Sequence, residues 1–120
     1  MVTLRLAAIT VDCADPGALA AFYCAAAGAE LTHEDDDSAW VTMDGTTWIY
    51  RKVDDYRAPT WPSSEVPLQV HLEFYVDDVA QAEKSLHGYG ATTIEPQPNP
   101  DSRGLVMLDP AGRPFCIGVR

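Results

Sequence analysis

The sequence has few basic residues. Lys and Arg number 8 against 18 Asp and Glu, which gives a formal net charge of −10. Proteins that bind nucleic acid or anionic lipid obtain much of their affinity from Lys and Arg, and here these residues are scattered along the chain without a cluster. The acidic excess instead favours solubility. We therefore expect no nucleic-acid partner.

Long hydrophobic runs and paired cysteines are also missing. No segment approaches the roughly 20 consecutive apolar residues of a membrane-spanning helix, and the N-terminal MVTLRL does not resemble a signal peptide. The three cysteines, Cys13, Cys24 and Cys116, are an odd number without C-x-x-C spacing. That pattern favours reduced thiols over a disulfide framework. We expect a cytoplasmic protein that does not associate with membranes.

Familiar catalytic motifs are absent too. The chain has no phosphate-binding loop, dinucleotide fingerprint or nucleophile elbow. The acidic run from Glu34 to Asp37 superficially resembles a calcium loop, but it lacks the spacing, the glycine and the closing glutamate of an EF-hand. We interpret it as a solvated hairpin tip.

What the sequence does contain is a repeat. Residues 8–28 (AITVDCADPGALAAFYCAAAG) have the order strand, Asp, helix, Gly, and residues 71–90 (HLEFYVDDVAQAEKSLHGYG) follow the same order. When Asp15 is aligned with Asp78, Ala8 aligns with His71. One copy therefore has a methyl group where the other has an imidazole, which makes any site shared by the copies chemically asymmetric.

Local signals define the elements of each copy. Alternating apolar residues predict first strands over 4–13 and 68–76. Asp15 and Asp78 are expected to cap the following helices, and Gly28 and Gly90 to end them. Further strands are expected over residues 29–33, 39–43, 47–53, 91–95, 104–108 and 113–119.

The order of these elements is β-α-β-β-β in each copy. We expect one domain, 1–120, made of the units 1–53 and 67–120, joined by the proline-containing linker 54–66. At 47% hydrophobic residues the chain can bury a real core. The predicted class is α+β, with two tandem βαβββ units that enclose a central cleft.

This architecture resembles the vicinal oxygen chelate superfamily, the glyoxalase and bleomycin-resistance fold. The likeness rests on the paired units and on the phrases VDCADPGALAAFY, HLEFYVDD and DPAGRPFCI; the phrase VDDYRAPTWP is similar to its glyoxalase-like subgroup. The resemblance implies a half-barrel fold. It also implies a homodimer, because members commonly dimerise, sometimes by exchanging units.

The resemblance further implies where a metal ion would be held. Metal-dependent members use ligands on the first and fourth strands of each unit, and the matching positions here are Ala8, Arg51, His71 and Cys116. Ala8 has no donor atom, and the Arg51 guanidinium repels a divalent cation. Cys116 suits only a soft metal, as a thiolate. Two protein ligands fall short of the usual three, so we expect no metal and no other cofactor.

His71 is the main catalytic candidate. It lies two residues from Glu73 on the polar face of the second unit's first strand, and a neighbouring carboxylate would orient the imidazole as a general base. The alternative is a vestigial metal ligand that now forms hydrogen bonds within a binding pocket.

Further residues are candidates for ligand binding. Arg51 could clamp an anionic group, or form a salt bridge with Glu73 or another carboxylate. Tyr75 and Trp61 could stack on a flat ligand; alternatively, Trp61 covers a sheet edge or contacts a partner. The complete set of predicted ligand contacts is Arg51, Thr10, Tyr75, Trp61, Ile49 and Cys116.

Three functions are compatible with these residues. The first is a metal-free protein that binds a small apolar or aromatic molecule, and sequestration of a drug or metabolite is one form of this function. The second is a lyase or isomerase in which His71 moves a proton, Glu73 assists and Arg51 stabilises an oxyanion. A metal-dependent glyoxalase or dioxygenase is disfavoured by the ligand positions. The sequence does not separate the first two.

Overall fold

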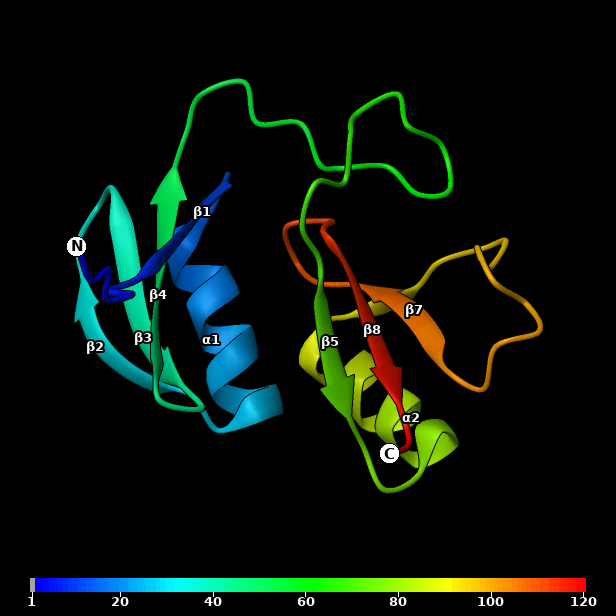
Figure 1. Cartoon of the computed structure of the whole chain (residues 1–120). Helices are drawn as coiled ribbons and strands as arrows, with labels where there is room; N and C mark the ends of the chain where they lie inside the picture. Colours follow the sequence, from blue (N-terminus) through cyan, green and yellow to red (C-terminus); the bar gives the residue numbers. More distant parts are fainter. Residues whose placement is uncertain (1) are drawn as a thin grey trace. The chain divides into compact units, whose positions relative to one another are not determined.

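The computed structural model describes residues 2–120 and divides into two compact units. The first unit ends at Tyr56 and the second begins at Arg57. Each has one helix and one four-stranded sheet (Figure 1). The α+β class and the repeated βαβββ order predicted from the sequence are therefore confirmed.

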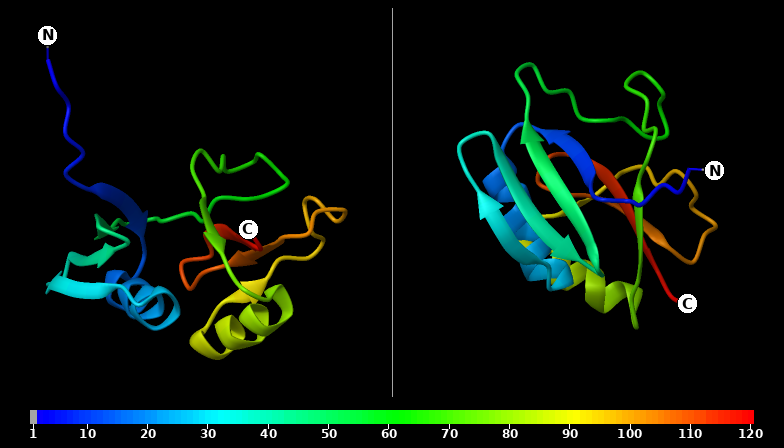
Figure 2. Two further views of the ribbon diagram at one scale, coloured as in Figure 1. Left: turned by 60° about the horizontal axis from the view of Figure 1, so that its bottom comes forward. Right: turned by 60° about the vertical axis from the view of Figure 1, so that its left-hand side comes forward.

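The first unit has its helix packed against one face of its sheet (Figure 2). The sheet order is β1-β4-β3-β2, with β1 parallel to β4 and the other neighbours antiparallel. The elements are β1 (Ile9–Cys13), α1 (Pro16–Ala27), β2 (Glu30–Glu34), β3 (Ser38–Met43) and β4 (Thr46–Lys52).

The ends of α1 follow the local sequence. Asp15 Oδ1 accepts a hydrogen bond from the Ala18 amide at 3.1 Å, and Pro16 is the first helical residue. At the other end, Gly28 has a φ of 66°, a left-handed conformation that glycine adopts without a steric penalty. Both predicted helix boundaries are confirmed.

The core of the first unit lies between α1 and the sheet. Leu19, Phe22 and Tyr23 of the helix are buried, and the Tyr23 ring stacks on Tyr50 of β4 with centroids 5.8 Å apart. Because side chains alternate along a strand, the residues between the buried ones of β1 and β4 lie on the opposite, open face of the sheet. These residues are Thr10, Asp12, Ile49 and Arg51.

The second unit has the same topology, with sheet order β5-β8-β7-β6 and β5 parallel to β8. Asp78 caps α2 through the Gln81 amide at 2.9 Å, and Gly90 ends it with a φ of 109°. Its elements are β5 (Leu72–Tyr75), α2 (Val79–Tyr89), β6 (Thr92–Thr93), β7 (Leu105–Leu108) and β8 (Pro114–Gly118). Its buried core residues include Leu86, Val106, Met107, Phe115 and Ile117.

The first strand of each unit is shorter than the alternation predicted. β1 begins at Ile9 rather than at residue 4, and Leu4 and Leu6 are exposed. Ile9 pairs with Trp48, and β4 begins only at Thr46, so the residues before Ala7 have no neighbouring strand. The alternation of Leu4 and Leu6 therefore does not mark a paired strand.

β5 is shortened for a related reason. Its predicted start at residue 68 is wrong, because Gln69 has a φ of 59° and interrupts the extended backbone. Val70, one of the alternating apolar residues of this segment, is exposed. The partner strand β8 starts at Pro114, which has no N–H to donate, and the paired register begins one residue later with Leu72 beside Phe115.

Candidate functional site

The open face of the second sheet carries ionisable and aromatic side chains that are candidates for function. Glu73 and Tyr75 alternate with Leu72 and Phe74 along β5, and Phe74 packs edge-on against Phe115 of the core. The parallel register places Cys116 of β8 directly beside Glu73. His71 immediately precedes β5, and its ring reaches the same face.

His71, Glu73 and Cys116 form a compact cluster. His71 Nε2 lies 3.8 Å from Glu73 Oε2, and one donor atom from each of the three residues lies within 4.8 Å of the other two. The His71 side chain is 28% exposed and that of Glu73 is 76% exposed. Imidazole, carboxylate and thiol thus meet at a site that solvent reaches from the Glu73 side.

The thiol in this cluster is a poor nucleophile by itself. Burial raises the pKa of Cys116 above its usual value of 9.0, and the negative charge of Glu73 raises it further. Both effects favour the protonated thiol at neutral pH, and nucleophilic attack requires the thiolate. The cluster is therefore not a cysteine–histidine pair activated for covalent catalysis.

Aromatic rings flank the cluster. The Trp61 ring lies against the His71 ring, with centroids 5.0 Å apart and planes tilted by 44°. Tyr75, at the other end of β5, is 73% exposed, and the Arg120 guanidinium carbon lies 5.4 Å from its ring centroid. Trp61 thus covers the imidazole, whereas Tyr75 presents an apolar ring to solvent with a cation beside it.

In the first unit, Arg51 is paired with a neighbour. Its Nη2 and Nε atoms lie 2.8 Å and 3.0 Å from the same oxygen, Asp12 Oδ1. Asp12 and Arg51 are also neighbours in the parallel register of β1 and β4. The structure thus realises the salt-bridge alternative for Arg51, with Asp12 rather than Glu73 as the partner. Thr10 and Ile49 are register neighbours on the same open face.

The strand registers correct one of the positions matched to the superfamily's metal ligands. With Asp15 aligned to Asp78, Thr10 aligns with Glu73. The residue beside Thr10 on β4 is Ile49, and the residue beside Glu73 on β8 is Cys116. Ile49, not Arg51, is therefore the counterpart of Cys116. The sequence comparison was displaced by two residues because it matched strands without their pairing.

The structure thus places His71, Glu73, Cys116 and Tyr75 on one face of the second unit, as the alternation along their strands predicts, and Trp61 contacts His71 there. The proximity of Glu73 to Cys116 was missed at the sequence level. The turn Asp109–Gly112 fixes the antiparallel register of β7 and β8, but the parallel register of β8 against β5 joins segments far apart in the sequence and has no local signal.

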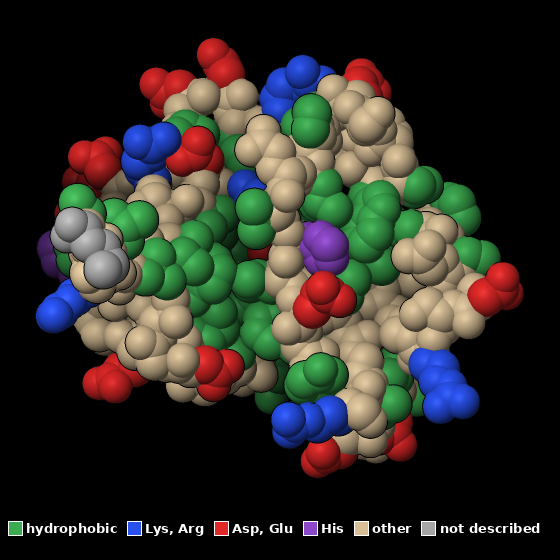
Figure 3. Space-filling view, viewed as in Figure 1, with side chains coloured by type: hydrophobic (Ala, Val, Ile, Leu, Met, Phe, Trp, Pro, Cys, Tyr) green, Lys and Arg blue, Asp and Glu red, His purple; other side chains and the backbone are tan. Residues whose placement is uncertain are grey.

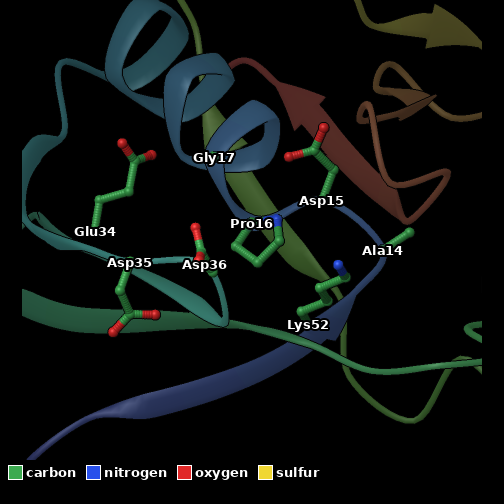
Figure 4. Close-up of a pocket in the computed structure, with 8 residues that line it drawn as sticks. All are labelled: Ala14, Asp15, Pro16, Gly17, Glu34, Asp35, Asp36 and Lys52. Atoms are coloured by element: carbon green, nitrogen blue, oxygen red, sulfur yellow. The ribbon is translucent and has the colours of Figure 1, made fainter.

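A separate polar pocket lies at the start of α1 (Figure 4). Its rim is acidic, with Lys52 as its one basic lining residue; it is lined by Ala14, Asp15, Pro16, Gly17, Glu34, Asp35, Asp36 and Lys52. Asp35 Oδ1 accepts hydrogen bonds from the Asp37 and Ser38 amides, both at 2.8 Å, and so closes the β2–β3 turn. The interpretation of residues 34–37 as a hairpin tip is confirmed.

Two surface properties bear on partners. On the face that Figure 3 shows, basic side chains are separated from one another and form no patch. Within residues 2–120, no helix has the length and apolar character that crossing a bilayer requires.

Comparison with known proteins defines the class. The family model described as Glyoxalase-like domain matches residues 8–118, so the chain belongs to this family, within the vicinal oxygen chelate superfamily. No curated protein matches the sequence.

Several solved structures share the fold. The fosfomycin resistance protein FosX from Listeria monocytogenes, complexed with Mn(II) and sulfate, has a TM-score of 0.71 at 16% identity, covering 99% of this chain and 94% of FosX. A possible glyoxalase from Bacillus cereus has a TM-score of 0.71 at 14% identity, with coverage of 97% and 99%. The glyoxalase family protein from Enterococcus faecalis gives 0.67 at 19% identity, with coverage of 94% and 95%. At these identities the likeness establishes the fold alone.

Proposed function

We propose that this protein binds a small apolar or aromatic molecule on the open face of its second unit, as a metal-free binding protein of the glyoxalase and bleomycin-resistance type. The observation that carries the proposal is the packing of Trp61 against His71, with Tyr75 exposed on the same face. This arrangement combines aromatic surface with a few polar groups, as small-molecule sites commonly do.

Each side chain of this face has a distinct part in the proposal. The rings of Trp61 and Tyr75 supply flat apolar area for stacking. His71 and Glu73 supply a hydrogen-bond donor and acceptor that orient the ligand, and Cys116 supplies a small polarisable contact. Thr10, Ile49 and Arg51 lie on the open face of the first unit and stay predictions as ligand contacts.

The proposal needs no metal at the family's four positions. In the first unit, Ala8 has no donor atom, and neither does Ile49, the counterpart of Cys116. The nearby Arg51 would repel a cation. A hard ion such as the Mn(II) in the FosX complex prefers oxygen and nitrogen ligands. The residues at these positions do not fit such an ion.

An enzymatic alternative has one observation in its favour. The 3.8 Å separation between His71 Nε2 and Glu73 Oε2 is short enough for the carboxylate to stabilise an imidazolium formed during proton transfer. This supports a lyase or isomerase with His71 as general base. The pairing of Arg51 with Asp12 weakens it, because that guanidinium already compensates a carboxylate.

Ligand screening tests the binding proposal. Thermal-shift measurements with aromatic metabolites and antibiotics, in the presence of EDTA, should identify compounds that stabilise the protein by about 2.7 kcal/mol at a concentration of 100 times Kd. Trp61→Ala should weaken binding of any such compound about tenfold or more, because a stacking surface is lost. Tyr89→Ala, at the exposed C-terminal end of α2, is the aromatic control and should bind normally.

A His71→Ala variant then separates binder from enzyme. With a binder, affinity falls and the wild type converts none of the ligands. With the enzyme, turnover is lost while affinity is retained. If no aromatic compound binds, or if Trp61→Ala binds as tightly as the wild type, the binding proposal fails.

We also propose a cytoplasmic homodimer. The three free cysteines support a reducing compartment, and the dimer is supported by the frequent dimerisation of superfamily members. Sedimentation at micromolar concentration should give twice the monomer mass of 13.1 kDa. A sedimentation profile with only the monomer would refute the dimer.

A further inference from the structure

We propose that Thr60 is a positioning residue of the binding face: its hydroxyl closes the loop from Thr60 to Val66 and thereby holds the Trp61 ring against His71. This inference rests on the proposed function, because it concerns how the binding face is shaped before a ligand arrives. The loop and the face belong to the same compact unit, which begins at Arg57.

Hydrogen bonds of Thr60 close the loop. The segment between β4 and β5 turns back on itself (Figure 1), and the Thr60 amide donates to the Val66 carbonyl at 2.9 Å. The Thr60 hydroxyl accepts from the Val66 amide at 3.1 Å and donates to the Ser63 carbonyl at 2.8 Å. The Val66 carbonyl is a more distant acceptor, at 3.3 Å. Because a hydroxyl has one proton and accepts through its lone pairs, this side chain links two points of the loop at once.

The residues just before the loop are fixed to the rest of the unit. Pro59 is buried. Ala58 lies against the turn between β7 and β8, where a Cβ atom placed on Gly112 would be only 3.1 Å from the Ala58 Cβ. The tip of the loop, residues 62–65, is exposed. Trp61 thus lies between a fixed start and an exposed tip, and closure by Thr60 determines the direction of its ring.

The position of the Trp61 ring matters for binding. Trp61 directly follows Thr60, and its ring centroid lies 5.0 Å from that of His71. A side chain that is already ordered binds without the entropy cost of ordering it. If the Thr60 hydroxyl is removed, water replaces its hydrogen bonds at the exposed tip, and the loop opens at little cost. Thr60 therefore contributes to affinity through Trp61, without contacting the bound molecule.

Fluorine NMR tests the positioning in the absence of a ligand. The full chain is labelled with 5-fluorotryptophan at its three tryptophans, and the loss of one resonance in Trp61→Phe assigns Trp61. His71→Ala should shift this resonance, because the neighbouring ring is removed, while the buried Trp48 gives an unaffected reference. In Thr60→Val the Trp61 resonance should move toward its position in the unfolded chain. In that background His71→Ala should no longer shift it.

Two variants control for the substitution itself. Thr60→Ser keeps the hydroxyl and should retain the wild-type Trp61 resonance. Ser64→Ala removes an exposed hydroxyl from the tip of the same loop and should also leave the resonance unchanged. Urea denaturation shows that each variant remains folded.

The aromatic dye 8-anilinonaphthalene-1-sulfonate provides the binding test. Thr60→Val should raise its Kd about three- to tenfold, which corresponds to the cost of ordering one side chain. In a Trp61→Ala background the same substitution should have no effect, because no ring is left to position. A merely structural role of Thr60 would instead weaken binding equally in both backgrounds.

Two results would overturn the inference: a Trp61 resonance that is unchanged in Thr60→Val, or an equal loss of dye affinity with and without the Trp61 ring. If the wild type binds neither the dye nor any compound of the thermal-shift screen, the proposed function fails, while the Trp61 resonance still decides whether Thr60 positions the ring. Failure of the inference and failure of the proposed function are therefore distinguishable.

Discussion

The two units share a topology but differ in the chemistry of their open faces. In the first, the aligned positions on the two parallel strands are Ala8, Thr10 and Ile49; in the second, they are His71, Glu73 and Cys116. The helix-facing sides are alike, with aliphatic and aromatic side chains buried in both. Duplication thus repeats the packing that the fold requires, and it leaves the opposite face of each sheet free to diverge.

The same comparison explains the ends of these strands. Asp12 and Arg51 in the first unit align with Tyr75 and Gly118 in the second, and each is a register pair. The first pair forms a salt bridge. In the second, Gly118 has no side chain to cover Tyr75, and the ring stays exposed. One unit therefore compensates its charges locally, whereas the other presents an aromatic surface.

The largest expected difference between the units is in core packing. Leu19 of α1 is 1% exposed and Leu86 of α2 is 9% exposed. We expect Leu19→Ala to lower the free energy of unfolding by about 3–5 kcal/mol and Leu86→Ala by about 2–3 kcal/mol, because the more enclosed cavity relaxes less. Urea denaturation measures both. A larger loss for Leu86→Ala would show that the second core is the better packed.

Helix capping should affect the two units equally. Asp15 and Asp78 each accept one amide hydrogen bond, at 3.1 Å and 2.9 Å. Asp15→Ala and Asp78→Ala should each cost about 1 kcal/mol of stability, and Asp→Asn at either site should cost less, since Asn also caps helices. Unequal alanine costs in urea denaturation would mean that one cap is supported by other contacts.

The connections between the second and third strands should differ in pH dependence. Asp35 organises the first, and its pKa is lowered from 3.8 to about 2, chiefly by His33 Nε2 at 2.8 Å and then by two backbone amides. Because the folded-state pKa is the lower one, this stabilisation is complete above about pH 4 and is lost as the pH falls through about 2. The Asp35 side chain is about half exposed to solvent, so the effect should be the smallest of the three.

In the second connection the neutral Gln97 bridges strand ends by donating to the Ile94 and Val106 carbonyls and accepting from the Val106 amide. Gln97→Ala should therefore destabilise the fold by the same amount at pH 2.5 and at pH 7. An NMR titration of the Asp35 carboxyl checks the first expectation, and urea denaturation at the two pH values checks the second. An ordinary Asp35 pKa near 3.8 would contradict the comparison.

Much of the fold was accessible from the sequence because its signals are local. Asp15, Asp78, Gly28 and Gly90 mark helix ends by their own side chains or lack of one. The errors arose where pairing with a neighbouring strand determines the structure. Leu6 fits the alternation, but no strand lies beside it. Arg51 was matched to a metal-ligand position of the superfamily that, by the strand register, belongs to Ile49.

The candidate site shows the same division. His71 and Glu73 could be placed on one face from their spacing, since side chains on a strand repeat every two residues. Cys116 lies more than forty residues away, and only the pairing of β8 with β5 brings its thiol to Glu73. The packing of Trp61 on His71 likewise depends on the path of the segment before β5, which alternation does not describe.

By itself, the sequence determined the repeated βαβββ order, the helix boundaries, the family and the asymmetry between Ala8 and His71. Each of these depends on residue type and short-range periodicity, which are properties of the sequence and do not require tertiary contacts. Only the tertiary structure decided the strand registers, the salt bridge of Arg51 with Asp12 and the meeting of imidazole, carboxylate and thiol. Those features depend on which residues become neighbours across strands, and that is set by packing of the whole sheet.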